Sequence, residues 1–300
     1  MHKSGFVTVI GKPNVGKSTF INGAIGEKIA IVSSKPQTTR NTVRGIYNRD
    51  DAQIVFIDTP GVHEPKHKLG SFMRDAALKT LNAVDLVLYM INAVEKFDDV
   101  DASIIKQLKR AKPKTFLVVN KIDLAKDIDR LSELIDTFKS HHPFDGVFAV
   151  SAKDGTYTKL LLKDIIQAMP EGPKYYPEDM SHDLGQSFMI AELIREKVLH
   201  LTQQEIPHSV MVTIDAMDED ESIEGLMNIH ASIIVERDSQ KGIIIGKGGK
   251  MIKRIGTRAR ADILALLGVK VYLDLHCKVE KDWRNKQRIL QAHGFKEDVI

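Results

Sequence analysis

The sequence has little of several features that would place it in a specialised class of protein. A single cysteine, Cys277, occurs among 300 residues, which excludes an internal disulfide and a zinc site built from several thiolates. The longest apolar stretch, residues 83–94, is interrupted by Asp85 and Asn92 and is far shorter than the ~20 apolar residues of a membrane-spanning helix. A β-rich run begins at Phe6, which leaves no room for a secretion signal. We therefore expect a cytosolic protein without a membrane span.

The chain as a whole also lacks a strong excess of one charge sign. The net charge is +3, with 43% hydrophobic and 28% charged residues, a composition that excludes collagen-like and globally disordered proteins. The charge is nevertheless uneven. Residues 239–261 contain seven basic and no acidic residues, and residues 209–226 contain six acidic and no basic residues. A charge run taken alone is usually a solvated face, so these runs need a motif to acquire a function.

Apolar, β-rich runs alternate with helical patterns through the first half of the chain. Continuous apolar runs are typical of parallel strands that helices cover on both faces. We therefore predict an α/β domain with a mostly parallel sheet, in which ligands bind at the carboxyl ends of the strands. The runs cover residues 6–10, 53–57, 86–91, 115–119 and 147–150.

A Pro-rich segment divides the chain. Three prolines within residues 170–177 interrupt regular structure and predict a linker. We place the first domain at residues 1–173, the linker at 174–184 and the second domain at 185–300. Alternating apolar residues in the second domain predict half-buried strands, in a small α+β unit that ends in a helix over residues 282–291.

A phosphate-binding motif follows the first predicted strand. Residues 11–18 read GKPNVGKS, which fits G-x-x-x-x-G-K-[ST] and opens a helical run. Glycines let backbone N–H groups surround phosphate oxygens, and the helix N-terminus adds partial positive charge. In this motif Lys17 reaches the β and γ phosphates and Ser18 ligates Mg²⁺. The residues expected to surround the phosphates are Gly11, Lys12, Pro13, Asn14, Val15, Gly16, Lys17, Ser18 and Thr19.

The phosphate end of the site is completed by residues 58–61, which read DTPG. We expect Asp58 to hold the metal through water and the Gly61 N–H to contact a γ-phosphate, with Thr59 and Pro60 between them. Residues 35–40 form a polar segment in which a GTPase supplies a threonine to Mg²⁺ and the γ-phosphate. We favour Thr39, with Thr38 as the alternative. The predicted metal ligands are Ser18, Thr39 and Asp58.

Two further motifs predict the identity of the base. Residues 120–123 read NKID, and the Asp123 carboxylate can accept hydrogen bonds from both the ring N–H and the amine of guanine. Adenine would present an acceptor instead, and an unpaired acceptor in a buried site is costly. Residues 151–153, SAK, are expected to close the base pocket. The predicted base-binding residues are Asn120, Lys121, Asp123, Ser151, Ala152 and Lys153.

The residue after DTPG predicts slow hydrolysis. Many GTPases have a glutamine there that orients the attacking water, whereas this chain has Val62. We therefore expect an unassisted rate on the order of 10⁻⁴ s⁻¹. Asn14 occupies the P-loop position at which related GTPases without the glutamine hold potassium, so activation by K⁺ is a hypothesis. The residues expected to take part in catalysis are Lys17, Thr39, Gly61 and Asn14.

The second domain carries a glycine loop at the centre of the basic run. Residues 246–249 read GKGG between apolar residues, and the pattern resembles a KH domain of the order helix, strand, strand, helix, helix, strand. In that module a G-x-x-G loop clamps about four unpaired nucleotides, while lysines neutralise phosphates. The predicted RNA-binding residues are Ile245, Gly246, Lys247, Gly248, Gly249, Lys250, Lys253 and Arg254.

Taken together, the two halves resemble the Era family of bacterial GTPases. Residues 191–197 (AELIREK) and 205–209 (EIPHS) also look like that family's sequence, so the resemblance covers essentially the whole chain. It implies a Ras-like P-loop GTPase domain followed by a type II KH domain, with GTP or GDP and Mg²⁺ as ligands. It also implies binding to the 3′ end of 16S rRNA, a role in small-subunit assembly, and peripheral contact with the inner face of the cell membrane. We expect a monomer in the cytoplasm.

Two alternatives from other classes stay open at this point. In one, the protein binds RNA and holds GDP as a structural ligand with little hydrolysis, which Val62 would permit. In the other, it is a membrane-surface signalling GTPase whose basic helix, residues 250–260, meets anionic lipid. The glycine loop favours RNA, because a lipid-binding patch does not need close backbone approach.

Overall fold

The computed structural model describes residues 1–62, 64–65, 67–292 and 295, and the chain divides into two compact units. The first contains residues 1–32 and 39–183 with Phe295. The second contains residues 33–38 and 184–292. The predicted second domain extends to residue 300, and its positions 293–294 and 296–300 lie outside the described residues.

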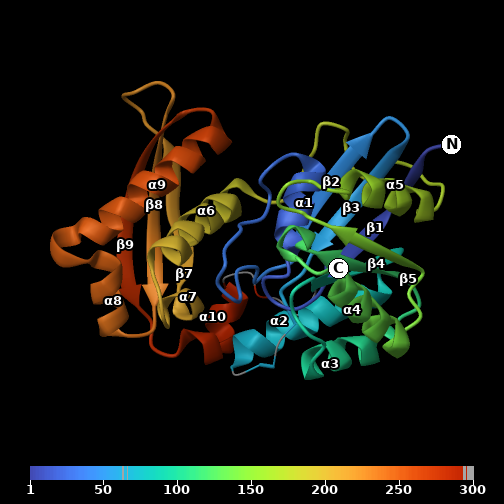
Figure 1. Cartoon of the computed structure of the whole chain (residues 1–300). Helices are drawn as coiled ribbons and strands as arrows, with labels where there is room; N and C mark the ends of the chain where they lie inside the picture. Colours follow the sequence, from blue (N-terminus) through green and yellow to red (C-terminus); the bar gives the residue numbers. More distant parts are fainter. Residues whose placement is uncertain (63, 66, 293–294, 296–300) are drawn as a thin grey trace. The chain divides into compact units, whose positions relative to one another are not determined.

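The first unit is built around a six-stranded sheet of order β2-β3-β1-β4-β5-β6 (Figure 1). All neighbouring strands are parallel except β2 and β3, which are antiparallel. The mostly parallel α/β sheet is therefore confirmed. Its elements are β1 (Lys3–Ile10), α1 (Lys17–Ile25), β2 (Val43–Arg49), β3 (Ala52–Asp58), α2 (Lys68–Lys79), η1 (Thr80–Asn82), β4 (Leu86–Asn92), α3 (Asp99–Leu108), β5 (Lys114–Asn120), η2 (Ile122–Leu124), α4 (Ile128–His141), β6 (Gly146–Val150) and α5 (Thr158–Ala168).

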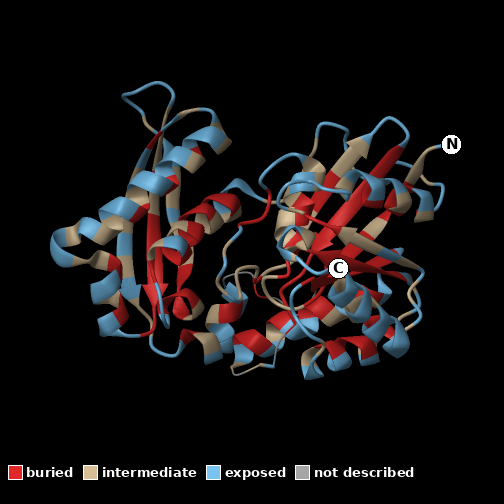
Figure 2. Ribbon diagram, viewed as in Figure 1, coloured by how far each residue is buried: buried red, intermediate tan, exposed pale blue. Residues whose placement is uncertain are grey.

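Burial explains why these strands read as continuous apolar runs. Every residue of β3 and of β4 is buried, and Figure 2 shows the buried residues concentrated along the central strands. Two covered faces strongly favour apolar side chains within the strands. The polar ends, Asp58, Asn92 and Asn120, therefore lie at the carboxyl edge of the sheet, where the ligand is expected.

The strand β2 has no counterpart among the predicted runs. It pairs with β3 from Val43↔Asp58 to Arg49↔Ala52, at the edge of the sheet, where only one neighbouring strand restricts its composition. Part of the predicted linker packs on this unit: the Gln53 Oε1 accepts from the backbone N–H of Tyr175 (2.6 Å) and Tyr176 (3.0 Å). The Pro-rich segment is thus held against β3 at Tyr175 and Tyr176 by the side chain of Gln53.

The second unit contains a three-stranded sheet of order β7-β8-β9. The strand β8 is antiparallel to β7 and parallel to β9. Apart from the four-residue helix α7, the order α, β, β, α, α, β is the one expected for a type II KH domain. Its elements are α6 (Gln186–Leu201), α7 (Ile206–Ser209), β7 (Met211–Glu219), β8 (Leu226–Val235), α8 (Asp238–Ile245), η3 (Lys247–Gly249), α9 (Lys250–Leu267), β9 (Lys270–Val279), η4 (Trp283–Asn285) and α10 (Gln287–Ala292).

Two contacts anchor the ends of this unit. The only tryptophan, Trp283, is fully buried and donates its indole N–H to the Ser209 carbonyl at 2.9 Å. The residues 33–38, which group with this unit, include Thr38, whose carbonyl accepts a hydrogen bond from the Arg195 guanidinium. Arg195 on α6 is itself 2% exposed and is paired with Glu192. The Thr38 carbonyl is therefore held by a buried guanidinium whose charge Glu192 balances.

Candidate functional site

The P-loop connects β1 to α1 at the carboxyl edge of the first sheet. Gly16 precedes α1 with a φ of 106°, and a Cβ atom there would lie 2.1 Å from the Asn120 Nδ2. Only glycine fits this position, because the backbone is left-handed and a side chain amide blocks the space. The P-loop conformation thus depends on packing against Asn120 of the NKID motif, about a hundred positions further along the chain.

Lys17 begins α1 and is held inside the loop. Its Nζ donates to the backbone carbonyls of Lys12 (3.0 Å) and Gly11 (3.3 Å), and the residue is only 6% exposed. Burial lowers the pKa of Lys17 to about 8, an effect that the nearby Asp58 carboxylate partly opposes. A buried ammonium held by two carbonyl oxygens has a third N–H that it can donate to a phosphate oxygen.

The predicted metal ligands converge. Ser18 Oγ donates to Asp58 Oδ2 at 2.6 Å and lies 3.0 Å from Thr39 Oγ1, which donates to the same carboxylate oxygen at 3.2 Å. The neighbouring Thr38 hydroxyl instead donates to the Lys35 carbonyl within its own loop (2.6 Å). This geometry favours Thr39 over Thr38 as the ligand.

Asp58 has features of a carboxylate that needs a cation. It is fully buried, and burial raises its pKa against the opposing influence of Lys17, Ser18 and Thr39. Its second oxygen, Oδ1, is buried without a hydrogen-bond partner among the described residues. Two hydroxyls and a carboxylate are the hard oxygen ligands that Mg²⁺ prefers, so the residues present fit this ion.

The DTPG segment closes against the P-loop. The Thr59 hydroxyl donates to the Val9 carbonyl at 2.8 Å, so this side chain fastens the segment to β1. The backbone N–H of Val62 donates to the Gly11 carbonyl at 3.1 Å. Gly61 and Pro60 are buried between these anchors, and the Val62 side chain is 5% exposed. Residue 62 therefore belongs to the core and supplies no polar group.

The base-recognition loops are joined by Asn120. Its amide Nδ2 donates to the Val15 carbonyl at 2.7 Å, and its Oδ1 accepts from the Ala152 N–H at 2.9 Å. The Ser151 hydroxyl donates to one oxygen of Asp123 at 2.8 Å. Asp123 is itself exposed, as a residue that contacts a base should be. Asn120 thus acts as a brace between loops rather than as an exposed ligand group.

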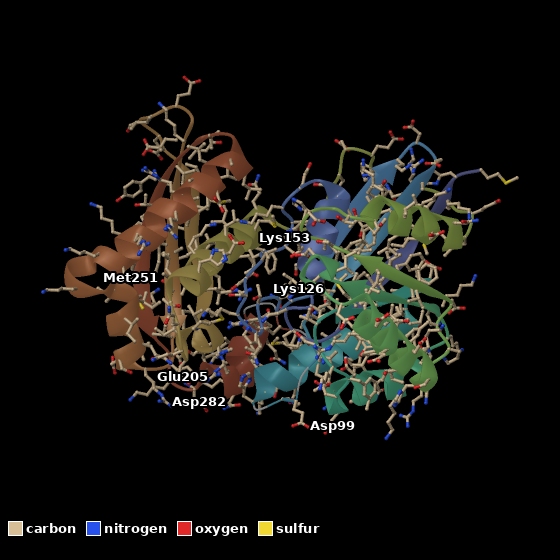
Figure 3. The ribbon with its side chains drawn as sticks, viewed as in Figure 1. Asp99, Lys126, Lys153, Glu205, Met251 and Asp282 are labelled. Carbon is tan, nitrogen blue, oxygen red and sulfur yellow. The ribbon has the colours of Figure 1, made fainter. Side chains whose placement is uncertain are left out.

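The remaining predicted residues occupy different positions. Lys121 has a left-handed φ of 65° and turns the chain into η2. Lys153 is exposed on the loop after β6 and is labelled in Figure 3. Asn14 has a φ of 62°, and Pro13 and Thr19 are half-buried. The Lys12 side chain leaves the P-loop for carboxylates of α3, which the sequence reading did not anticipate.

In the second unit the G-x-x-G loop separates α8 from α9. Gly246 has φ 71° and ψ 170°, and a Cβ atom there would lie 2.7 Å from the Cβ of Met251. Lys247 and Gly248 form an exposed 3-10 turn, whose glycine has a φ of 61°. The loop therefore presents bare backbone and a lysine to solvent, with Met251, labelled in Figure 3, beneath it.

A groove of about 370 Å³ lies between α9 and β9, on the helix that follows the loop. The predicted Lys253 lines it, while Ile245 is half-buried and Lys250 and Arg254 are exposed. The other lining residues are not among the predicted RNA-binding residues, because no spacing within α9 or β9 shows that the two elements form a groove. They are Ile252, Gly256, Thr257, Arg260, Tyr272, Leu273 and Leu275.

Known proteins share both halves of this arrangement. The family described as 50S ribosome-binding GTPase matches residues 6–121, and the KH domain family matches residues 205–284. A structure of a point variant of Era from Aquifex aeolicus bound to GDP·AlF4⁻ is 39% identical, with 98% of this chain and 99% of that chain covered and a TM-score of 0.94. A structure of Era with MgGDPNP and nucleotides 1506–1542 of 16S ribosomal RNA is 39% identical over the same shares, with a TM-score of 0.95.

Proposed function

The chain belongs to the Era family of GTPases, and we propose that it is a GTP-hydrolysing switch that binds the 3′ end of 16S rRNA during small-subunit assembly. The observation that carries this proposal is the convergence of Ser18, Thr39 and Asp58 beside a buried Lys17. A Gly-rich turn without a ligand would have no reason to bury these charged groups.

We assign the nucleotide site as follows. Ser18, Thr39 and Asp58 would hold Mg²⁺, which neutralises charge on the β and γ phosphates when bound. Lys17 has three ammonium N–H donors, so it can give a hydrogen bond to the phosphates while the Gly11 and Lys12 carbonyls hold the other two. The Gly61 N–H contacts the γ-phosphate, and Asp123 reads guanine. Each of these groups is preorganised by strand ends or by the P-loop, which is how phosphoryl transfer is chiefly catalysed.

Hydrolysis by this site alone should be slow. Val62 is buried and has no polar atom on its side chain, so it cannot orient the attacking water. We propose that K⁺ bound near Asn14 supplies part of the missing stabilisation. Single-turnover hydrolysis should then be faster in KCl than in NaCl, and Asn14→Ala should remove the difference. Equal rates in the two salts would show the potassium proposal to be wrong.

The groove of the second unit fits single-stranded RNA. Lys247, Lys250 and Lys253 are exposed along the loop and helix, where they can neutralise phosphates. Tyr272 is 55% exposed at the edge of the groove and offers a ring face on which a base can stack. Close approach of the RNA backbone is allowed by the glycines of the loop.

The test is a titration of labelled single-stranded RNA matching the 16S rRNA 3′ end against the full chain. The protein is loaded in parallel with MgGDPNP or with GDP. A switch should bind at least about fivefold more tightly in one nucleotide state, because coupling between two sites is typically 1–3 kcal/mol. Equal binding in both states would favour two independent modules with the nucleotide as a structural ligand.

Matched variants locate the RNA contact. Lys247→Glu reverses a charge in the glycine loop and should weaken RNA binding, while Lys281→Glu reverses another exposed lysine of the same unit, outside the loop and groove. Equal losses for the two variants would mean that only overall charge matters. A reversal at Lys247 without any loss of affinity would remove the loop from the RNA site.

Membrane contact and a monomeric state are further parts of the proposal. No helix within the described ranges combines the length and the apolar character needed to span a bilayer. For contact with anionic lipid, the basic helix α9 is the candidate. Co-sedimentation with vesicles containing phosphatidylserine, in the presence and absence of RNA, tests whether lipid and RNA compete for it, and light scattering measures the mass in solution.

A further inference from the structure

Lys12 lies in the P-loop, but its side chain does not face the phosphate site. Its Nζ lies 2.9 Å from Asp101 Oδ2, 3.0 Å from Asp98 Oδ2 and 3.5 Å from Glu95 Oε2. The Lys12 side chain is only 11% exposed. One P-loop residue is therefore held by carboxylates that lie more than eighty positions further along the chain.

The carboxylates that receive Lys12 are themselves rigidly placed. Asp98 caps α3, and its side chain accepts from the backbone N–H groups of Val100 (3.0 Å) and Asp101 (3.1 Å). Asp101 Oδ2 accepts from the Asp98 N–H at 3.1 Å, and Asp101 Oδ1 accepts from the Tyr89 hydroxyl at 2.7 Å. We name Asp98, Asp101 and Tyr89 the α3 clamp. Every hydrogen bond of the clamp restricts the position of the Lys12 ammonium.

The clamp depends on the Lys12 charge. Asp101 is fully buried; burial raises its pKa, and hydrogen bonds from Lys12 and Tyr89 oppose that rise. A buried carboxylate without a cation is strongly unfavourable. Burial alone would lower the pKa of Lys12, but the hydrogen bonds to Asp101 and Asp98 raise it. The ion pair is therefore a fixed structural connection between the P-loop and α3.

The backbone of the same residue contacts the catalytic lysine. The Lys12 carbonyl accepts from the Lys17 Nζ at 3.0 Å. The adjacent Gly11 carbonyl accepts from both Lys17 Nζ (3.3 Å) and the Val62 N–H (3.1 Å). The side chain of Lys12 thus contacts the α3 clamp, while its backbone carbonyl contacts the Lys17 ammonium.

We propose that Lys12 is a positioning residue for Lys17: the α3 clamp fixes residue 12 so that its carbonyl aims the Lys17 ammonium at the γ-phosphate. The inference rests on the proposed GTPase function. Loss of the clamp would let the P-loop carbonyls shift. A misplacement of about 1 Å can cost around a hundredfold in rate. Binding of GDP depends less on this aim, because GDP has no γ-phosphate.

The experiment compares four variants of the full chain in single-turnover GTP hydrolysis and in affinity for MgGDPNP and GDP. Lys12→Met removes the cation and should slow hydrolysis of bound GTP by about tenfold or more, and Lys12→Arg should restore most of the rate. Asp98→Asn removes the charge of the exposed clamp residue and so weakens its ion pair with Lys12. Asp99→Asn is the matched control, because Asp99 is an exposed neighbour in the same helical turn outside the clamp (Figure 3).

A double variant separates positioning from stability. Lys12→Met with Asp101→Asn removes both buried charges, so the melting temperature should recover relative to Lys12→Met while hydrolysis stays slow. Recovery of the rate together with stability would overturn the proposal, and so would a wild-type rate in Lys12→Met or equal losses in Asp98→Asn and Asp99→Asn. If the wild-type protein did not hydrolyse GTP, the GTPase function itself would fail. The inference on Lys12 would then be tested by binding alone. Lys12→Met should weaken the affinity for MgGDPNP more than the affinity for GDP, and equal weakening would overturn the inference.

Discussion

The buried Lys17 makes nucleotide affinity depend on pH in a direction that the structure fixes. Burial lowers the pKa of its ammonium from 10.5 to about 8 in the free protein. Phosphate oxygens favour the charged form, so a bound nucleotide raises this pKa. Between the two pKa values the complex carries a proton that the free protein lacks, and binding must take up that proton. Affinity is therefore constant below about pH 8 and falls as the pH rises above it.

The magnitude follows from the same pKa. At pH 9 about one free site in eleven still carries a charged Lys17, so affinity for MgGDPNP should be roughly tenfold weaker than at pH 7. Isothermal titration across pH 6.5 to 9.5, in pairs of buffers with different ionisation enthalpies, measures both the affinity and the proton uptake.

Arginine supplies the control for this prediction. Lys17→Arg carries a positive charge that is not lost between pH 6.5 and 9.5. The affinity of this variant for MgGDPNP should therefore lack the pH dependence that deprotonation of Lys17 causes. The guanine ring also titrates at alkaline pH, but it does so equally with both proteins and cancels in their ratio. Identical pH profiles for the two proteins, or no proton uptake by the wild type at pH 8.5, would refute the reasoning.

Three other substitutions test separate parts of the structure. Asp123→Asn replaces one acceptor by a donor, so GTP should bind at least about a hundredfold more weakly while a xanthine nucleotide is accepted; competition binding measures both. Trp283→Ala empties a fully buried site and leaves the Ser209 carbonyl without its donor; it should reduce unfolding free energy by about 3–5 kcal/mol in urea denaturation followed by circular dichroism. Gly246→Ala places a Cβ 2.7 Å from that of Met251 at a φ of 71°; RNA affinity should fall in the titration while GTP hydrolysis is unchanged.

The local motifs could be predicted because each one serves a single chemical task with a few neighbouring residues of fixed type. The P-loop, DTPG and NKID sequences each stand at the end of a buried strand, and parallel strands bring such ends to one edge. The choice between Thr38 and Thr39 was harder, since the two side chains are identical and adjacent. The fold separates them by turning the Thr38 hydroxyl toward the Lys35 carbonyl.

What the sequence did not reveal depends on contacts between distant positions. The edge strand β2 is defined by its pairing with β3 rather than by a strong apolar pattern of its own. Tyr272 lines the groove because β9 lies beside α9, and no spacing within either element states that they are neighbours. Lys12 belongs to the P-loop motif, whereas its side-chain partners, Asp98 and Asp101, lie 86 and 89 positions away.

The nucleotide site uses buried charges, whereas the proposed RNA site uses exposed ones. This difference explains why the residues of the nucleotide site were easier to predict from the sequence. The phosphate end of the nucleotide site relies on two charged residues, Lys17 and Asp58, and both are buried at a cost that phosphate and a cation would offset. Such groups must be exact in type and position, so they produce a recognisable motif. The glycine loop and α9 of the second unit instead carry several exposed lysines and arginines, which in the proposed RNA complex would act largely through counterion release. Since each exposed charge contributes a small and interchangeable share, only the glycine loop, where the backbone itself must approach the RNA, constrains the sequence tightly.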